Sequence, residues 1–162
     1  MKDYTRKNSL RLQGYDYSRA GMYFITICTK DSELMFGKVH DGKMELSEHG
    51  EIAKNELLKT SELLAFNLAQ FIIMPNHVHF IAVLPEPQID DETKTSIIIR
   101  NKQLIPKIVQ AYKAAVSRKL GFSLWQRSYF DNILRSKEEY EIVKQYIESN
   151  PATWQKDKFF LT

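Results

Sequence analysis

The stretch that most constrains this chain is FIIMPNHVHFIAVL, from Phe71 to Leu84. Two apolar runs flank the turn-forming letters MPN, and the second run opens with His77 and His79 separated by one residue. Successive side chains of a β-strand point to opposite faces, so these two histidines share a face. Paired imidazoles on a rigid strand are a natural start for a metal site, although an isolated His-x-His pair more often binds no metal.

A second informative stretch is SKEEYEIVKQYIESNP, which ends at Pro151. Ser136 and Glu139 have the spacing of a capping box, and the proline marks where a helix must stop. Tyr146 falls on the apolar face, and Asn150 lies one turn later on that face. Taken alone, a core tyrosine and an ordinary helix-ending asparagine explain these two residues. The apolar positions at helical spacing are Ile142, Val143, Tyr146 and Ile147.

Taken together, the MPNHVH turn and strand and a helix ending in YIxxNP about seventy residues later resemble the single-tyrosine HUH transposases. Within them, the chain is most similar to the REP-associated tyrosine transposases. The resemblance covers nearly the whole chain and includes RLQGYDYSRAGMYFITICT, LWQRSYFDNIL and the closing NPATW. It implies that His77, His79 and Asn150 bind a divalent cation, Mg or Mn, and that Tyr146 is the nucleophile. Val78 fits the apolar middle position of the HUH triplet.

The expected order of elements, strand–helix–strand–strand–helix–strand–helix, indicates an α+β sandwich with helices packed on a largely antiparallel sheet. The resemblance implies the ferredoxin-like form of this class, with the HUH motif on a central strand and the tyrosine on a C-terminal helix. The sequence predicts strands at 22–29, 66–74, 77–84 and 123–134, a hairpin of 34–39 with 43–46, and helices at 47–59, 104–120 and 136–150.

Length and composition indicate one globular domain spanning residues 1–162. No apolar run approaches the ~20 residues of a membrane span, and the basic N-terminus has no apolar signal segment. The single cysteine, Cys28, excludes an internal disulfide and a multi-cysteine zinc site. No phosphate-cradling glycine-rich loop is present, which disfavours nucleotide hydrolysis. We expect a cytoplasmic protein without a membrane partner.

The distribution of charge favours a nucleic-acid partner. Between residues 100 and 146 there are ten lysines and arginines against four acidic residues, and residues 1–20 read as a basic extended arm with interleaved aromatics. A solvated lysine-rich helix face and tyrosines packed over a sheet edge remain alternatives. Residues 85–103 include a polar, proline-containing break that predicts a mobile loop. The candidate DNA-contacting residues are Arg11, Tyr15, Tyr17, Arg19, Lys113, Arg118, Lys119 and Arg127.

These features lead to the hypothesis of a metal-dependent endonuclease and strand transferase that acts on single-stranded hairpin or repeat DNA. The reaction would pass through a 5′-phosphotyrosine, a bond that stores the energy for resealing without ATP. Two alternatives remain: a non-catalytic protein that binds hairpin DNA, and a phosphodiesterase that uses water instead of Tyr146. The sequence leaves open whether the protein is a monomer or a homodimer.

Overall fold

The computed structural model describes residues 21–84 and 104–160. The expected arm at 1–20, with Arg11, Tyr15, Tyr17 and Arg19, and the expected loop at 85–103 lie outside the described residues.

The main body follows a β-α-β-β-α-β order, which is the ferredoxin-like arrangement. Its elements are β1 (Gly21–Cys28), α1 (Glu48–Leu63), β4 (Asn67–Met74), β5 (His77–Leu84), α3 (Leu104–Leu120) and β6 (Phe130–Leu134). The sheet has the order β4-β5-β1-β6, and each neighbouring pair is antiparallel. The predicted fold class is therefore confirmed, and the histidine-bearing strand β5 is central in the sheet.

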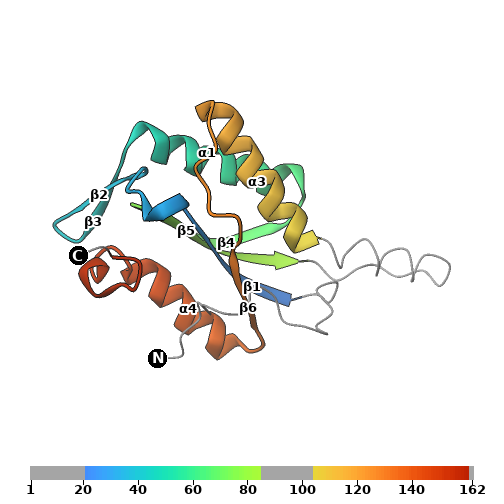
Figure 1. Ribbon diagram of the computed structural model, residues 1–162. Helices are drawn as coiled ribbons and strands as arrows, with labels where there is room; N and C mark the ends of the chain where they lie inside the picture. Colours follow the sequence, from blue (N-terminus) through green and yellow to red (C-terminus); the bar gives the residue numbers. More distant parts are fainter. Residues whose placement is uncertain (1–20, 85–103, 161–162) are drawn as a thin grey trace.

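Helices cover both faces of this sheet. In Figure 1, α1 and α3 lie on one side, and α4 (Lys137–Ser149) lies on the other. Successive side chains of β5 point alternately toward the α1 and α3 layer and toward α4. Val78, Phe80 and Ala82 belong to the larger core beneath α1 and α3, whereas Ile81 packs with α4. His77 and His79 have the same parity as Ile81, so the strand presents both histidines to the α4 side.

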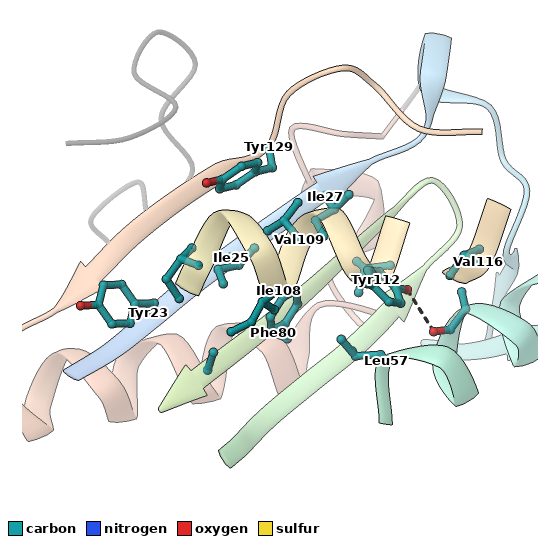
Figure 2. Close-up of a cluster of buried hydrophobic side chains, with 14 of the residues drawn as sticks. Tyr23, Ile25, Ile27, Leu57, Phe80, Ile108, Val109, Tyr112, Val116 and Tyr129 are labelled. Carbon is teal, nitrogen blue, oxygen red and sulfur yellow. Dashed lines mark hydrogen bonds between the residues drawn. The ribbon is translucent and has the colours of Figure 1, made fainter. Parts of the chain in front are cut away.

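The larger core is made of aromatic and branched aliphatic side chains from β1, β5, α1 and α3 (Figure 2). Tyr112 of α3 is fully buried there, and its hydroxyl donates a hydrogen bond to the carbonyl oxygen of Ala53 in α1 at 3.0 Å. This bond satisfies a phenol that burial would otherwise leave without a partner, and it ties the two helices together.

A small hairpin stands beside the main sheet, formed by β2 (Gly37–His40) and β3 (Lys43–Leu46). The turn between them places Asp41 and Gly42 at positive φ, as Asp-Gly predicts for a two-residue hairpin. The first strand begins at Gly37 and not at residue 34. Leu34 is 58 % exposed, and the chain before Gly37 passes through the short 3-10 turn η1 (Lys30–Ser32).

The predicted helix termini depend on caps, and two of these are confirmed. Ser47 accepts a hydrogen bond from the N–H of Gly50, and Ser136 accepts one from the N–H of Glu139. Helix α1 continues to Leu63 and not to residue 59, because no breaking residue interrupts it before Ala65, which has positive φ. The prediction that Ile142 lies on the buried face of α4 is wrong, because this residue is 43 % exposed.

The predicted strand at 123–134 is wrong in its first half. Only Phe130–Leu134 forms β6, although an isolated bridge joins Thr29 to Trp125. Before that point the backbone of the segment bonds the end of β1, where the N–H of Gln126 donates to the carbonyl oxygen of Cys28 at 2.9 Å. The segment also contacts α3: Lys113 Nζ donates to the carbonyl oxygen of Gln126 at 2.7 Å, and the Trp125 indole N–H donates to the carbonyl of Lys113 at 3.1 Å. The segment is therefore bonded to both α3 and the end of β1 before it joins the sheet as β6.

Within the two described stretches, no helix combines the length and the hydropathy that crossing a bilayer requires.

Candidate active site and metal centre

Two fully buried imidazoles form the centre of the site. His77 and His79 are both 0 % exposed, and their Nε2 atoms lie 3.0 Å apart. Residues two apart on a strand bring their side chains to the same face. Both Nε2 atoms therefore face the same point between the two rings, a shared position where a single ion could contact both.

The outer nitrogen of His77 has a fixed partner, which determines its protonation. Its Nδ1 lies 2.8 Å from Oδ1 of Asn76, and the amide nitrogen of Asn76 donates to the carbonyl oxygen of Phe159, also at 2.8 Å. The amide orientation therefore leaves only an acceptor facing His77, so Nδ1 carries the hydrogen. In the neutral ring, Nε2 then keeps its lone pair for the shared position.

The outer nitrogen of His79 meets a group that can either donate or accept. Thr26 is its cross-strand neighbour on β1, and Oγ1 of Thr26 lies 2.7 Å from Nδ1 of His79. A hydroxyl can serve as donor or acceptor, so either tautomer of His79 is satisfied.

Burial keeps both histidines neutral. Loss of solvation lowers the pKa of His77 to about 4, against the opposing effect of the Asp157 charge and of the nearby Asn150 side chain. Loss of solvation also lowers the pKa of His79 well below its usual value, with a further lowering by His77. Neutral imidazoles are the form that binds metal ions.

Helix α4 brings the two other predicted site residues to the pair. The hydroxyl of Tyr146 lies 3.5 Å from Nε2 of His79, and its ring makes an edge contact with Phe24, with 6.1 Å between ring centroids. Asn150 is the C-cap of the helix and is fully buried. Four positions that the sequence separated into two stretches, His77, His79, Tyr146 and Asn150, thus meet on one side of the sheet.

A fifth residue, Asp157, was not predicted from the sequence. Its Oδ2 accepts hydrogen bonds from Nδ2 of Asn150 at 2.6 Å and from the hydroxyl of Tyr146 at 3.3 Å. One ligand atom from each of His77, His79 and Asp157 lies within 4.8 Å of the others. The only local signal was an acidic residue in the charged tripeptide at 156–158, a pattern that is more typical of a solvated turn.

The C-terminal aromatic residues cover this cluster. After the 3-10 turn η2 (Trp154–Lys156), the ring of Phe159 packs at a tilt against His77 with 4.5 Å between ring centroids, and the centroid of Trp154 lies 5.9 Å from that of His77. These C-terminal aromatic residues therefore pack back on the body of the protein. The tail therefore excludes water from one side of the histidine pair.

The donor set fits a divalent cation. The amide oxygen of Asn150 is buried, yet it accepts no hydrogen bond of ordinary geometry from the described residues. Such an orphaned acceptor is costly unless a further group binds it. Two imidazole nitrogens with lone pairs, this amide oxygen and the Asp157 carboxylate give a mixed nitrogen and oxygen set, which suits first-row divalent ions and Mg²⁺.

The candidate DNA-contacting residues of the described part lie apart from this cluster. Lys113 and Arg127 line a groove of about 410 Å³ between α3 and the segment before β6. Arg118 and Lys119 occupy the last turn of α3. Because α3 and α4 cover opposite faces of the sheet, these side chains and the histidine pair are on different sides (Figure 1). Lys113 Nζ already bonds the carbonyl oxygens of residues 126 and 128.

A ferredoxin-like sheet that presents a His-x-His pair on its central strand to a tyrosine on a flanking helix defines the class of single-tyrosine HUH proteins. Within this class, the chain belongs to the IS200-like transposases, because the family described as "Transposase IS200 like" matches residues 22–150.

Two proteins of Haemophilus influenzae are similar to this chain. One, described as an uncharacterized protein, is 32 % identical over 96 % of this chain and 93 % of its own length. The other, described as a "Putative REP-associated tyrosine transposase", is 24 % identical over 85 % of this chain and 73 % of its own length.

Two solved structures share the fold. A REP-associated tyrosine transposase bound to a REP hairpin superposes with a TM-score of 0.64 at 17 % identity, over 91 % of this chain and 76 % of that one. A Deinococcus radiodurans protein described as a "putative transposase" gives a TM-score of 0.51 at 22 % identity, over 85 % of this chain and 95 % of that one.

Proposed function

We propose that the protein is a metal-dependent endonuclease and strand transferase for single-stranded hairpin or repeat DNA, with Tyr146 as its nucleophile. The observation that carries the proposal is the placement of the Tyr146 hydroxyl 3.5 Å from Nε2 of His79. A nucleophile and a metal-binding pair that are adjacent can act on one phosphate.

His77, His79 and Asn150 are the residues that would hold the cation, Mg or Mn. When bound, the ion supplies positive charge that neutralises the scissile phosphate and favours attack at phosphorus. The chain contributes the alignment. Asn76 fixes the tautomer of His77, and strand β5 holds both rings in one orientation.

Tyr146 carries the covalent step. Its phenolic oxygen bonds to phosphorus, the bond from phosphorus to the 3′ oxygen breaks, and a 5′-phosphotyrosine and a free 3′-OH result. The proton that Tyr146 loses is balanced by the one that the 3′ oxygen gains. A 3′-OH from the same strand or another strand can reverse the step, so strand transfer needs no ATP.

Hairpin DNA is the substrate class that the likeness to known proteins supports. The structural neighbour with a TM-score of 0.64 was solved bound to a REP hairpin. An unpaired strand next to such a hairpin is flexible enough to align a phosphate with the half-buried Tyr146. Monomeric and homodimeric forms are both compatible with one site per chain.

A covalent-trapping assay tests the proposal. The full chain is mixed with labelled single-stranded hairpin DNA from its own genomic flanks, with Mg or Mn, and separated on a denaturing gel. We expect a metal-dependent shifted band that disappears in Tyr146→Phe and in His77→Ala. Tyr140→Phe is the matched control, since Tyr140 lies on the same helix and packs against the same core.

Two other results would replace the proposal. Metal-dependent cleavage without a shifted band, unchanged in Tyr146→Phe, would identify a phosphodiesterase that uses water. Tight hairpin binding without cleavage of any flanking sequence would identify a DNA-binding protein without turnover.

A further inference from the structure

Resting on the proposed function, we propose that Asp157 is an additional protein ligand of the cation. The site would then combine two imidazoles, the amide oxygen of Asn150 and a carboxylate from the C-terminal segment.

The geometry places the carboxylate among the other donors. One ligand atom from each of His77, His79 and Asp157 lies within 4.8 Å of the others, a spread that small side-chain rotations close around one ion. Oδ2 of Asp157 lies 2.6 Å from Nδ2 of Asn150, so the carboxylate also determines how that amide is oriented. Because Asp157 accepts the hydrogen bond of the Asn150 amide nitrogen, the amide oxygen of Asn150 is the atom left to bind the ion.

The charge of the site gives an independent reason. Two neutral imidazoles and an amide carry no negative charge, and both histidines and Asn150 are fully buried. A dication that entered this buried place without a carboxylate would lose hydration with no opposite charge to offset the loss. Asp157 supplies the negative charge, and hard carboxylate oxygen is the donor that Mg and Mn prefer.

The carboxylate is also held in position before any ion arrives. Its Oδ1 accepts the backbone N–H of Phe159 at 2.8 Å, which directs Oδ2 toward the site. The carbonyl of Phe159 accepts from Asn76, and Asn76 in turn contacts His77. One asparagine therefore links the histidine pair to the segment that carries the carboxylate. This segment would be part of the metal centre as well as its cover.

Calorimetric titration of the full chain with Mn²⁺, without DNA, tests the assignment. We expect Asp157→Asn to weaken Mn²⁺ binding at least tenfold and His77→Ala to abolish it. Asp157→Asn is nearly isosteric and keeps an oxygen that can accept the N–H of Phe159. Glu148→Gln is the matched control: it removes one negative charge from an exposed position of α4, and we expect binding within twofold of the wild type.

Thermal unfolding in EDTA checks that each variant is folded. If Asp157→Asn does not fold, Asp157→Ser takes its place. The short serine hydroxyl can still accept a hydrogen bond from the N–H of Phe159 but cannot reach the ion. We expect the same weakening of Mn²⁺ binding, at least tenfold, for this variant. Wild-type affinity in a folded Asp157 variant would overturn the inference while leaving the His77, His79 and Asn150 site in place. Absence of Mn²⁺ binding to the wild-type chain would overturn the metal site itself.

Discussion

The hydroxyl of Thr26 lies 2.7 Å from Nδ1 of His79, its direct cross-strand partner, and this hydroxyl can satisfy His79 in either tautomer. Without a metal, His77 offers a lone pair at Nε2, so the 3.0 Å contact needs a hydrogen on Nε2 of His79. Thr26 then donates to Nδ1. If Nε2 of His79 held a cation, the ring hydrogen would have to be on Nδ1, and the Thr26 hydroxyl would accept a hydrogen bond from it.

Replacing this hydroxyl should weaken metal binding while leaving the fold intact. We expect Thr26→Val to lower Mn²⁺ affinity by about 10- to 100-fold, because the metal-bound tautomer loses its acceptor. Thr26→Ser keeps a hydroxyl and should bind nearly as the wild type does. Calorimetric titration measures both variants. Equal affinity in the valine and serine variants would show that Thr26 has no part in orienting His79.

Asn76 should matter for stability as well as for metal binding, because it is 2 % exposed and bonds both His77 and the Phe159 carbonyl. We expect Asn76→Ala to lower the free energy of unfolding by about 1–3 kcal/mol, since it leaves buried polar groups without partners. Urea denaturation in EDTA measures this effect apart from the metal. Asn67→Ala, at an exposed position of β4, is the control and should change stability by less than about 0.5 kcal/mol.

Gly50 should not tolerate alanine, although alanine is the better helix former. In α1, a Cβ at Gly50 would lie 2.1 Å from the carbonyl oxygen of Phe36, which is backbone and cannot rotate away. We expect Gly50→Ala to lower the free energy of unfolding by about 1–3 kcal/mol, reversing the gain of about 1 kcal/mol that propensity alone predicts.

Gly121→Ala tests backbone strain without crowding, and its effect on the free energy of unfolding is compared with that of Gly50→Ala by urea denaturation. Gly121 has a φ of +82°, and a Cβ added there would meet no atom of the described residues within 4 Å. Only the left-handed backbone therefore opposes this substitution, at a cost of about 1–2 kcal/mol. A stabilised Gly50→Ala variant would show that the chain near Phe36 can move aside.

The buried hydroxyl of Tyr112 should make stability depend on pH in the alkaline range. Burial, aided by the charge of Glu56, raises the pKa of Tyr112 far above its usual value of 10.0. Its contribution is therefore complete below pH 10 and is lost as the pH rises further, because only the unfolded state ionises there. At pH 7 we expect Tyr112→Phe to cost about 0.5–1.5 kcal/mol through the lost bond to Ala53.

Urea denaturation of both proteins between pH 7 and pH 11 measures this dependence. The wild-type advantage should shrink above pH 10 by up to about 1.4 kcal/mol per pH unit. Parallel curves for the wild type and Tyr112→Phe would contradict the expectation.

Much of the fold was predictable because its signals are local. The β-strand alternation that pairs His77 with His79, the Asp41-Gly42 turn and the cap at Ser136 each depend on neighbours in the sequence. The same local order gave the β-α-β-β-α-β arrangement. Local signals were weakest at 123–134, where apolar and aromatic letters suggested one long strand. Lys113 of α3 bonds the carbonyl oxygen of Gln126 in this segment, and periodicity carries no record of such a partner.

The sequence by itself determined that two histidines share a strand face and that Tyr146 and Asn150 share a helix face one turn apart, because both follow from backbone periodicity. The tertiary structure alone decided that these two faces meet, at 3.5 Å between Tyr146 and His79, and that Asp157 joins them. A residue in a short charged turn has no periodic pattern to reveal its neighbours. Its place was set by the packing of Phe159 against His77 and by the bond from Asn76, contacts between segments about eighty residues apart.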